Sequence, residues 1–339
     1  MRHRVVALLG MVAMGVAPAA QAFGTLPGYK GSTGEHERIT RRALACEAGV
    51  GAAECFQPGT IDQLAGTLAE GGLGWGAVGA PDRSTQVLKS HPHCDNGDRP
   101  ALPGYPTLNV EDRSPAEALE ACRAHAAGKL DEAVREAGAI LDSRGRIRAS
   151  QVPASCVFVF GVPGRAKCNA IEAFGAVLHA SQDFYSHSNW TDHVMLSGHE
   201  TPRRPQGLGQ IGPAPWISLR KPAVPLPVGL LTGCFALPSE AAGCVYTGPG
   251  GDKLERLTHA YLNKDTGEIP VDRARPVGAG TTARGAVDGA FRRAVEAAVL
   301  DTEDKWRLFQ ERLVATYGAE RGRRIACAIR SDDPVRACA

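Results

Sequence analysis

The sequence predicts an all-α protein built as a single multi-helix domain. Apolar residues recur at helical intervals in almost every segment that has a regular pattern. The alternation typical of half-buried strands is sustained nowhere, and residues 157–162 are the one candidate strand. Several helical segments also begin with residues that favour helix N-termini. The exception is segment 201–251, which is rich in proline and glycine and is expected to be an irregular insertion or lid, with a short hairpin closed by Cys234 and Cys244.

Six helices are expected in chain order. Ser32 or Thr33 can cap the first, which runs to residue 47, and Thr60 can cap the second, at residues 60–70. The third starts most clearly, because Ser114 precedes a proline and is followed by a glutamate three residues later. The third helix is therefore expected at residues 114–141, and the last three at residues 168–187, 253–263 and 283–317.

Residues 1–22 have the features of a signal peptide. Two arginines precede an apolar run at residues 5–16, which is too short to cross a bilayer, and the residues up to Ala22 fit the small-residue cleavage pattern. Cleavage would leave Phe23 as the first residue, with residues 23–339 forming one all-α domain. The protein is therefore expected to be secreted or periplasmic.

The cysteines agree with export. All ten follow the expected cleavage point, and an even number of cysteines in an exported chain favours disulfides. Sequence leaves the connectivity open, but short loops favour local pairing. The expected pairs are Cys46–Cys55, Cys156–Cys168, Cys234–Cys244 and Cys327–Cys338, which leaves Cys94–Cys122.

The segment Leu178–Trp190, LHASQDFYSHSNW, carries the most distinctive pattern in the chain. His179, Asp183 and His187 are each four residues apart, so a helix projects all three from one face. Imidazole and carboxylate ligands suit a divalent metal such as zinc. The alternative is a helix whose polar residues face water. The surrounding aromatic and apolar residues favour burial instead, and buried ionisable groups need partners or a metal.

Three other segments could supply further ligands. Asp82 and His93 lie in a stretch rich in glycine and turn-forming residues, and a loop there can be directed at the helix face. His91 competes with His93 for the same role. His36 lies on the first expected helix and His259 on the fifth, and each is a weak candidate when taken alone.

Taken in order, these motifs resemble the bacterial zinc-dependent phospholipases C and the single-strand-specific fungal nucleases, which share an all-helical fold. The segments PDRS, HCDNGD, LHASQDFYSHSNW, LLTGCF and HAYLNKD look most similar to the branch related to the heterokaryon-incompatibility protein C (Het-C). The resemblance extends from Phe23 to about Asp265. It implies an all-α domain of the zinc-dependent phospholipase C type.

The resemblance also implies a ligand set for up to three divalent ions, typically zinc. Phe23, through its α-amino nitrogen and carbonyl oxygen, would join His36 and Asp183 at one ion. Asp82, His93, His179 and the bridging Asp183 would hold a second ion, and His187, His259 and Asn263 a third. Asp82 would in addition have the catalytic role of orienting or deprotonating the nucleophile.

Two positions depart from the family pattern. The interval between Asp183 and His187 is shorter than in the family. Asn263 stands where the family has a carboxylate, and Asp265 is the alternative ligand there.

The function implied by the resemblance is that of an exported zinc-dependent phosphodiester hydrolase. It would be phospholipase C-like and act on phospholipids through a metal-bound hydroxide. A separate hypothesis, based on the valines, leucines and Trp216 of the insertion, is that this segment contacts a membrane surface. One alternative is a non-catalytic Het-C-like metal-stabilised surface or interaction protein, and the other is a single-strand nuclease. Nucleic acid is the less favoured partner, because the formal charge is only +2 and becomes zero once the two arginines of the signal peptide are lost.

Overall fold

The computed structural model shows a mostly helical fold with two short strands, which confirms the all-α expectation at the level of fold class. The structure describes Phe23 and residues 32–51, 54–67, 76–99, 114–158, 164–195, 198–201, 203–222, 224–236, 239–247 and 250–338. The expected signal peptide at residues 1–22 lies outside the described residues, as does most of the candidate strand at residues 157–162.

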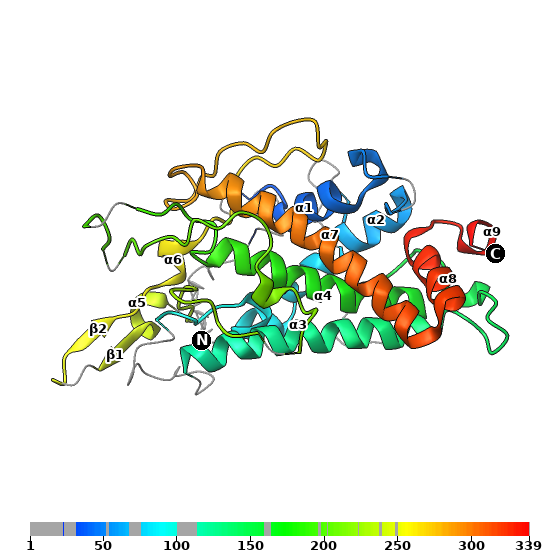
Figure 1. The fold of residues 1–339 in the computed structure, drawn as a ribbon, viewed down its shortest axis with the longest axis horizontal. Coiled ribbons are helices and arrows are strands. Elements are labelled where there is room, and N and C mark those ends of the chain that lie inside the picture. The colour runs from blue at the N-terminus through cyan, green and yellow to red at the C-terminus, as the bar shows by residue number, and fades with distance from the viewer. Residues whose placement is uncertain are drawn as a thin grey trace, which may run out of the picture.

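The helix α4 (Ala166–His187) forms the centre of the fold, and nearly all of its side chains are buried. It packs along α3 (Pro115–Gly138) on one side and against α7 (Ala290–Tyr317) on another (Figure 1). The helices α1 (Glu35–Leu44) and α2 (Pro58–Ala65) lie together at the edge of this group, with α1 against α7 and α2 against α4.

Two helices that the sequence analysis did not predict complete the C-terminal end. The helix α8 (Ala319–Arg330) packs back on α7, and the single-turn α9 (Pro334–Ala337) packs on α8. Both lie at the opposite end of the molecule from the hairpin of strands β1 (Val245–Thr247) and β2 (Lys253–Glu255) (Figure 1). Their own pattern is helical, because the buried residues of α8 recur at intervals of three and four.

Local sequence explains where the expected helices begin. Ser114 and Glu117 form the reciprocal capping box at the start of α3. At α1 the N-cap is Gly34 and not Ser32 or Thr33 as expected, and the Ser32 and Thr33 hydroxyls instead donate to the carboxylate of Glu35. The helix α7 starts later than expected, because Gly289 before it has a φ of 67°, which interrupts the right-handed helix.

The expected helix at residues 253–263 is wrong. Residues Lys253–Glu255 form strand β2, which pairs with strand β1 (Val245–Thr247) in an antiparallel hairpin, and only His259–Leu262 form a helix, α6. The backbone N–H of Arg256 donates a hydrogen bond to the carbonyl of Cys244, and the N–H of Cys234 donates to the carbonyl of Leu257. These tertiary hydrogen bonds override the helical pattern. The hairpin therefore follows the Cys234–Cys244 loop instead of lying within it.

The segment 201–251 is irregular as expected, with the short helices η8 (Pro215–Ile217) and α5 (Glu240–Gly243) as its only helices in the described residues. Short 3-10 helices also connect the long elements elsewhere. They are η2 (Cys46–Ala48), η3 (Ala77–Gly79), η4 (Pro81–Arg83), η5 (Thr85–Leu88), η6 (His91–His93) and η7 (Ala149–Gln151).

The five expected disulfides are confirmed. Cys46 bonds to Cys55, Cys94 to Cys122, Cys156 to Cys168, Cys234 to Cys244 and Cys327 to Cys338. A chain with this many disulfides belongs in an oxidising, extracellular environment. Within the described ranges, none of the helices has the length and apolar character that crossing a bilayer requires.

Candidate metal centre

The helix α4 projects His179, Asp183 and His187 from one face, as the four-residue spacing predicts. All three side chains are buried. The helix stays regular to His187, where it ends, so the short interval after Asp183 still places that histidine one further turn along the same face. Both ligand groups of the centre are built around this face of α4.

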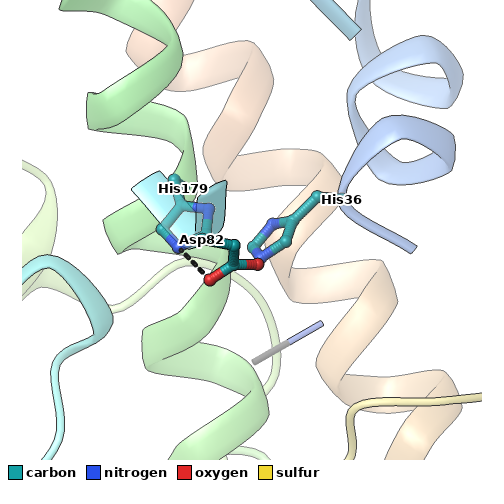
Figure 2. A group of neighbouring side chains, drawn as sticks. All are labelled: His36, Asp82 and His179. Atoms are coloured by element: carbon teal, nitrogen blue, oxygen red, sulfur yellow. Dashed lines mark ion pairs between the residues drawn. The ribbon is translucent and has the colours of Figure 1, made fainter. Parts of the chain in front are cut away.

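The first ligand group consists of His36, Asp82, His93, His179 and Asp183, and it draws on α1, η4, η6 and α4. His179 Nε2 lies 3.1 Å from Asp183 Oδ2, 3.5 Å from Asp82 Oδ1 and 3.0 Å from His93 Nδ1. Figure 2 shows His36, Asp82 and His179 converging from three separate elements. The structure therefore brings together the five histidine and aspartate residues that the resemblance assigned to the first two ions.

Asp183 lies at the middle of the first ligand group. Its Oδ1 is 3.0 Å from His36 Nε2, and its Oδ2 is 2.9 Å from His93 Nδ1. Two ligand atoms bound to one tetrahedral zinc ion lie about 3.3 Å apart. The observed separations are close to that value, so small adjustments of the side chains would admit ions on both sides of the Asp183 carboxylate.

The Nδ1 atoms of His179 and His36 each face a hydrogen-bond acceptor outside the first ligand group. His179 Nδ1 lies 2.9 Å from the carbonyl oxygen of Val78, and His36 Nδ1 lies 2.7 Å from Gln182 Oε1. The amide nitrogen of Gln182 donates to two threonine hydroxyls, which assigns Oε1 as the acceptor. Both Nδ1 atoms must therefore carry the hydrogen, and both Nε2 lone pairs face the ligand group, the arrangement that a metal-binding histidine needs.

Close packing brings η3 to α4. A Cβ atom added to Gly175 would lie 2.5 Å from the backbone of Ala77, so only glycine allows this approach. This close approach places the Val78 carbonyl oxygen beside His179. The helix η4, which carries Asp82, follows η3 in the chain.

Phe23 lies beside the first ligand group. Its fully buried ring packs edge-on against His36, with ring centroids 5.8 Å apart, and also contacts Phe291 of α7. The residue that the resemblance makes the mature N-terminus is therefore held next to the histidine with which it would share an ion.

The second ligand group consists of Asp95, His187, His259 and Asp265, one turn further along α4. His187 Nε2 lies 2.9 Å from His259 Nε2 and 3.4 Å from Asp265 Oδ1, and His187 Nδ1 lies 2.9 Å from Asp95 Oδ1. Asp265 Oδ2 is 3.9 Å from His259 Nε2. Two ring nitrogens at 2.9 Å would repel through their lone pairs unless a proton or a cation lay between them.

Among the described residues, no hydrogen bond joins the Asn263 side chain to either ligand group. The alternative, Asp265, takes the place that the resemblance gave to Asn263, since its carboxylate faces both His187 and His259. The backbone explains the difference, because α6 ends at Leu262 and Asn263 is extended, so the expected helical spacing from His259 no longer applies.

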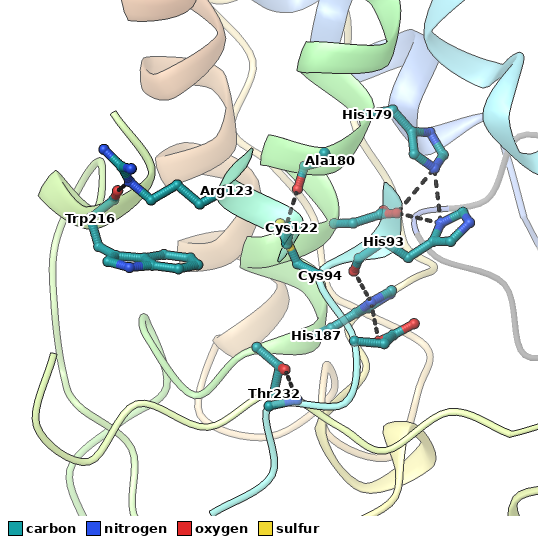
Figure 3. The surroundings of a disulfide bond; sticks show 12 residues. His93, Cys94, Cys122, Arg123, His179, Ala180, His187, Trp216 and Thr232 are labelled. Carbon is teal, nitrogen blue, oxygen red and sulfur yellow. Dashed lines mark hydrogen bonds and ion pairs between the residues drawn. A yellow bond between two sulfur atoms is a disulfide. The ribbon is translucent and has the colours of Figure 1, made fainter. Parts of the chain in front are cut away.

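Sequence reasoning missed Asp95, although it lies two residues after His93 in HCDNGD. Figure 3 shows the disulfide between Cys94 and Cys122, which ties this loop to α3, while the Cys94 sulfur lies 3.3 Å from the carbonyl oxygen of Ala180 on α4. Cys94 has a φ of 54°, so the chain turns between the two flanking residues. This turn sends His93 to the first ligand group and Asp95 to the second.

Without metal, the charges at this centre compensate one another. Burial lowers the pKa of His36, but the charges of Asp183 and Asp82 outweigh burial and raise the pKa from 6.5 to about 9. The pKa of His187 is raised well above its usual value by Asp95 and Asp265 despite burial. Burial would raise the pKa of Asp183, but His179 and His36 hold it well below 3.8. Protons thus occupy positions that cations would take.

Glu37, next to His36 on α1, is a further buried carboxylate near the first ligand group. Burial raises its pKa to about 8, and its two oxygens have no hydrogen-bond partner within the described part of the chain. At neutral pH it is therefore mainly protonated and adds little negative charge to the first ligand group.

One other expectation needs correction. Trp216 is fully buried, with its ring 5.6 Å from that of Phe184, so it cannot be the residue that meets a membrane.

His125 of α3 lies outside both ligand groups. It packs against His91, and burial lowers its pKa to about 3.

The donor set suits a borderline metal such as zinc, because it combines neutral imidazoles with carboxylates and supplies at least three donors to each group. The class of protein that the fold and the site define is therefore a disulfide-bonded, mostly helical protein with buried histidine and aspartate clusters able to hold metal ions. Comparison with protein-family models, with curated proteins and with solved structures gave no match to this chain.

Proposed function

We propose that the protein is an exported zinc-dependent phosphodiester hydrolase, phospholipase C-like, that acts on phospholipids. The observation that carries the proposal is the position of Asp183, whose two oxygens face different histidines, His36 on one side and His93 on the other. A carboxylate so placed can bridge two cations, and paired cations suit the displacement at phosphorus that phosphodiester hydrolysis requires.

Each residue of the first ligand group has a definite task in this proposal. When bound, divalent ions activate water and polarise a phosphoryl oxygen. His36 and His179 present their Nε2 atoms because their Nδ1 atoms are held by Gln182 and Val78. Asp82, whose carboxylate lies 3.5 Å from His179 Nε2, would orient the attacking water and accept its proton, as the family resemblance implies.

The proposal includes export through a cleaved signal peptide. The five disulfides support an oxidising destination. The burial of Phe23 against His36 supports cleavage before this residue, because Phe23 lies beside the first ligand group.

Burial of the ligands favours a second candidate function. His36, His179 and Asp183 have no exposed surface, and a closed coordination sphere is typical of structural metal sites. In that case the metal would stabilise the fold of a non-catalytic, Het-C-like surface or interaction protein.

One sequence of measurements separates these candidates. The secreted, signal-cleaved protein is analysed for bound metals and then assayed on p-nitrophenyl phosphocholine, phosphatidylcholine vesicles and single-stranded DNA. Stoichiometric zinc with cleavage of the two choline substrates is expected. Zinc without turnover on any substrate would identify the structural role, and cleavage of DNA alone would identify a nuclease. A protein without stoichiometric metal would refute both zinc proposals.

A further inference from the structure

The insertion contributes a carboxylate to the surroundings of the second ligand group. Glu240 lies in α5, inside the loop that the Cys234–Cys244 disulfide closes. Its Oε2 accepts a hydrogen bond from the backbone N–H of Ala260 at 3.2 Å, and its Oε1 lies 3.6 Å from Nδ1 of His259. The carboxylate therefore faces the side of the imidazole ring that points away from His187.

The two atoms that face each other are His259 Nδ1 and Glu240 Oε1. Both are buried, and neither has a hydrogen-bond partner among the described residues. A buried donor and a buried acceptor left unpaired side by side are rare in native structures and need an explanation. A shift of about half an ångström would bring them to hydrogen-bond distance.

The same disulfide fixes both residues. The N–H of Cys234 donates to the carbonyl of Leu257 at 2.7 Å, and the N–H of His259 donates to the carbonyl of Cys234 at 2.8 Å. Packing is tight here, since a Cβ atom on Gly233 would lie 2.3 Å from Cα of His259. The loop that carries Glu240 and the helix that begins with His259 thus form one unit.

We propose that Glu240 is a positioning residue for His259. It accepts a hydrogen bond from Nδ1 of His259 and so directs the Nε2 lone pair at the point shared with His187 and Asp265. Metal-binding histidines commonly use a carboxylate in this way, and loss of such a partner typically weakens metal affinity by about 10–100-fold. The inference rests on the metal centre proposed above and assigns the insertion a part in building it.

The test uses the full oxidised protein and two substitutions, Glu240→Ala and Glu240→Gln. The matched control is Glu255→Ala, because Glu255 also contacts α6, through the Tyr261 hydroxyl, but not His259. Affinities for zinc are measured by competition with a chelator, and the sites are resolved by NMR of the cadmium-substituted protein.

Glu240→Ala is expected to weaken the binding of one ion about 10–100-fold and to shift one cadmium resonance, with the remaining sites unchanged. Glu240→Gln keeps a carbonyl acceptor and is expected to lose less. The proposal is overturned if Glu240→Ala binds every ion as the control does, or if all sites weaken equally. A wild-type protein that binds no metal would instead refute the proposed function, and this result would be evident before any variant is made.

Discussion

The Oδ1 atom of Asp183 lies 3.0 Å from Nε2 of His36, and this contact joins the central helix α4 to the first helix of the chain. Both side chains are completely buried. The other oxygen of Asp183 faces His93 and His179, so this carboxylate links all the histidines of the first ligand group. The integrity of the group should therefore depend on Asp183 more than on any other residue.

The substitution Asp183→Asn tests this dependence. It removes the negative charge while keeping the size of the side chain, so two ions should lose a shared ligand. Hydrolysis should fall by more than about 100-fold, since outer partners of metal ligands alone account for about 10–100-fold in affinity or activity. Metal content and turnover are measured together. Glu172→Gln on the same helix is the control, and equal behaviour of the two variants would contradict the bridging position.

The pKa of His36 predicts that stability falls with rising pH in the metal-free protein, whereas the stabilisation by bound metal grows. Burial lowers the pKa of His36, but Asp183 and Asp82 raise it from 6.5 to about 9 in the metal-free protein. The protonated pair therefore stabilises the metal-free fold fully below pH 6.5, and this contribution is lost as the pH rises through about 9.

Metal binds the neutral imidazole, so its stabilising effect should grow over the same interval. The difference in Tm between the zinc-loaded and the chelator-treated protein should widen from about pH 6.5 to pH 9. Thermal denaturation with the disulfides intact measures this difference. Parallel Tm profiles for the two forms would show that His36 does not exchange a proton for a metal ion.

Trp216→Ala should destabilise the protein, because the ring is fully buried against Phe184 and its indole N–H donates to Glu120 Oε1 at 3.4 Å. A large-to-small change at such a site typically costs about 3–5 kcal/mol in the free energy of unfolding. Denaturant titration measures it. Ile211→Ala on the same insertion is the control, since Ile211 is 94% exposed and its loss should cost less than about 0.5 kcal/mol. A Trp216→Ala variant as stable as the control would contradict the buried position.

Two disulfides of nearly equal loop length allow a matched comparison. Cys234–Cys244 closes a separation of 10 residues beside the second ligand group, and Cys327–Cys338 closes a separation of 11 residues at the C-terminal end. Replacing either pair by serine should cost about 2–4 kcal/mol of stability.

Only the Cys234→Ser/Cys244→Ser variant should also lose affinity for one metal ion, because only that loop holds the elements around His259. Chelator competition on both variants gives the result. Equal metal affinity in the two variants would show that the insertion does not shape the second ligand group.

Sequence reasoning succeeded where local chemistry decides the structure. The capping box of Ser114 and Glu117 fixed the start of α3, and the four-residue spacing of His179, Asp183 and His187 placed them on one helical face. The loop position of Asp82 and His93 indicated that they could reach that face, the resemblance favoured His93 over His91, and the structure brings Asp82 and His93 to the face.

The sequence by itself determined the helical class and the helical face of the centre, because capping and periodicity act between residues that are near in the chain. It favoured the five disulfide pairs through loop length, and the structure decided the connectivity. Only the tertiary structure decided that residues 253–255 form a strand, that Trp216 is buried, and that Asp265, Asp95 and Glu240 surround the second pair of histidines. These outcomes depend on contacts between segments far apart in the chain. Such contacts are set by packing around α4 and by the turn at Cys94, which no local pattern encodes.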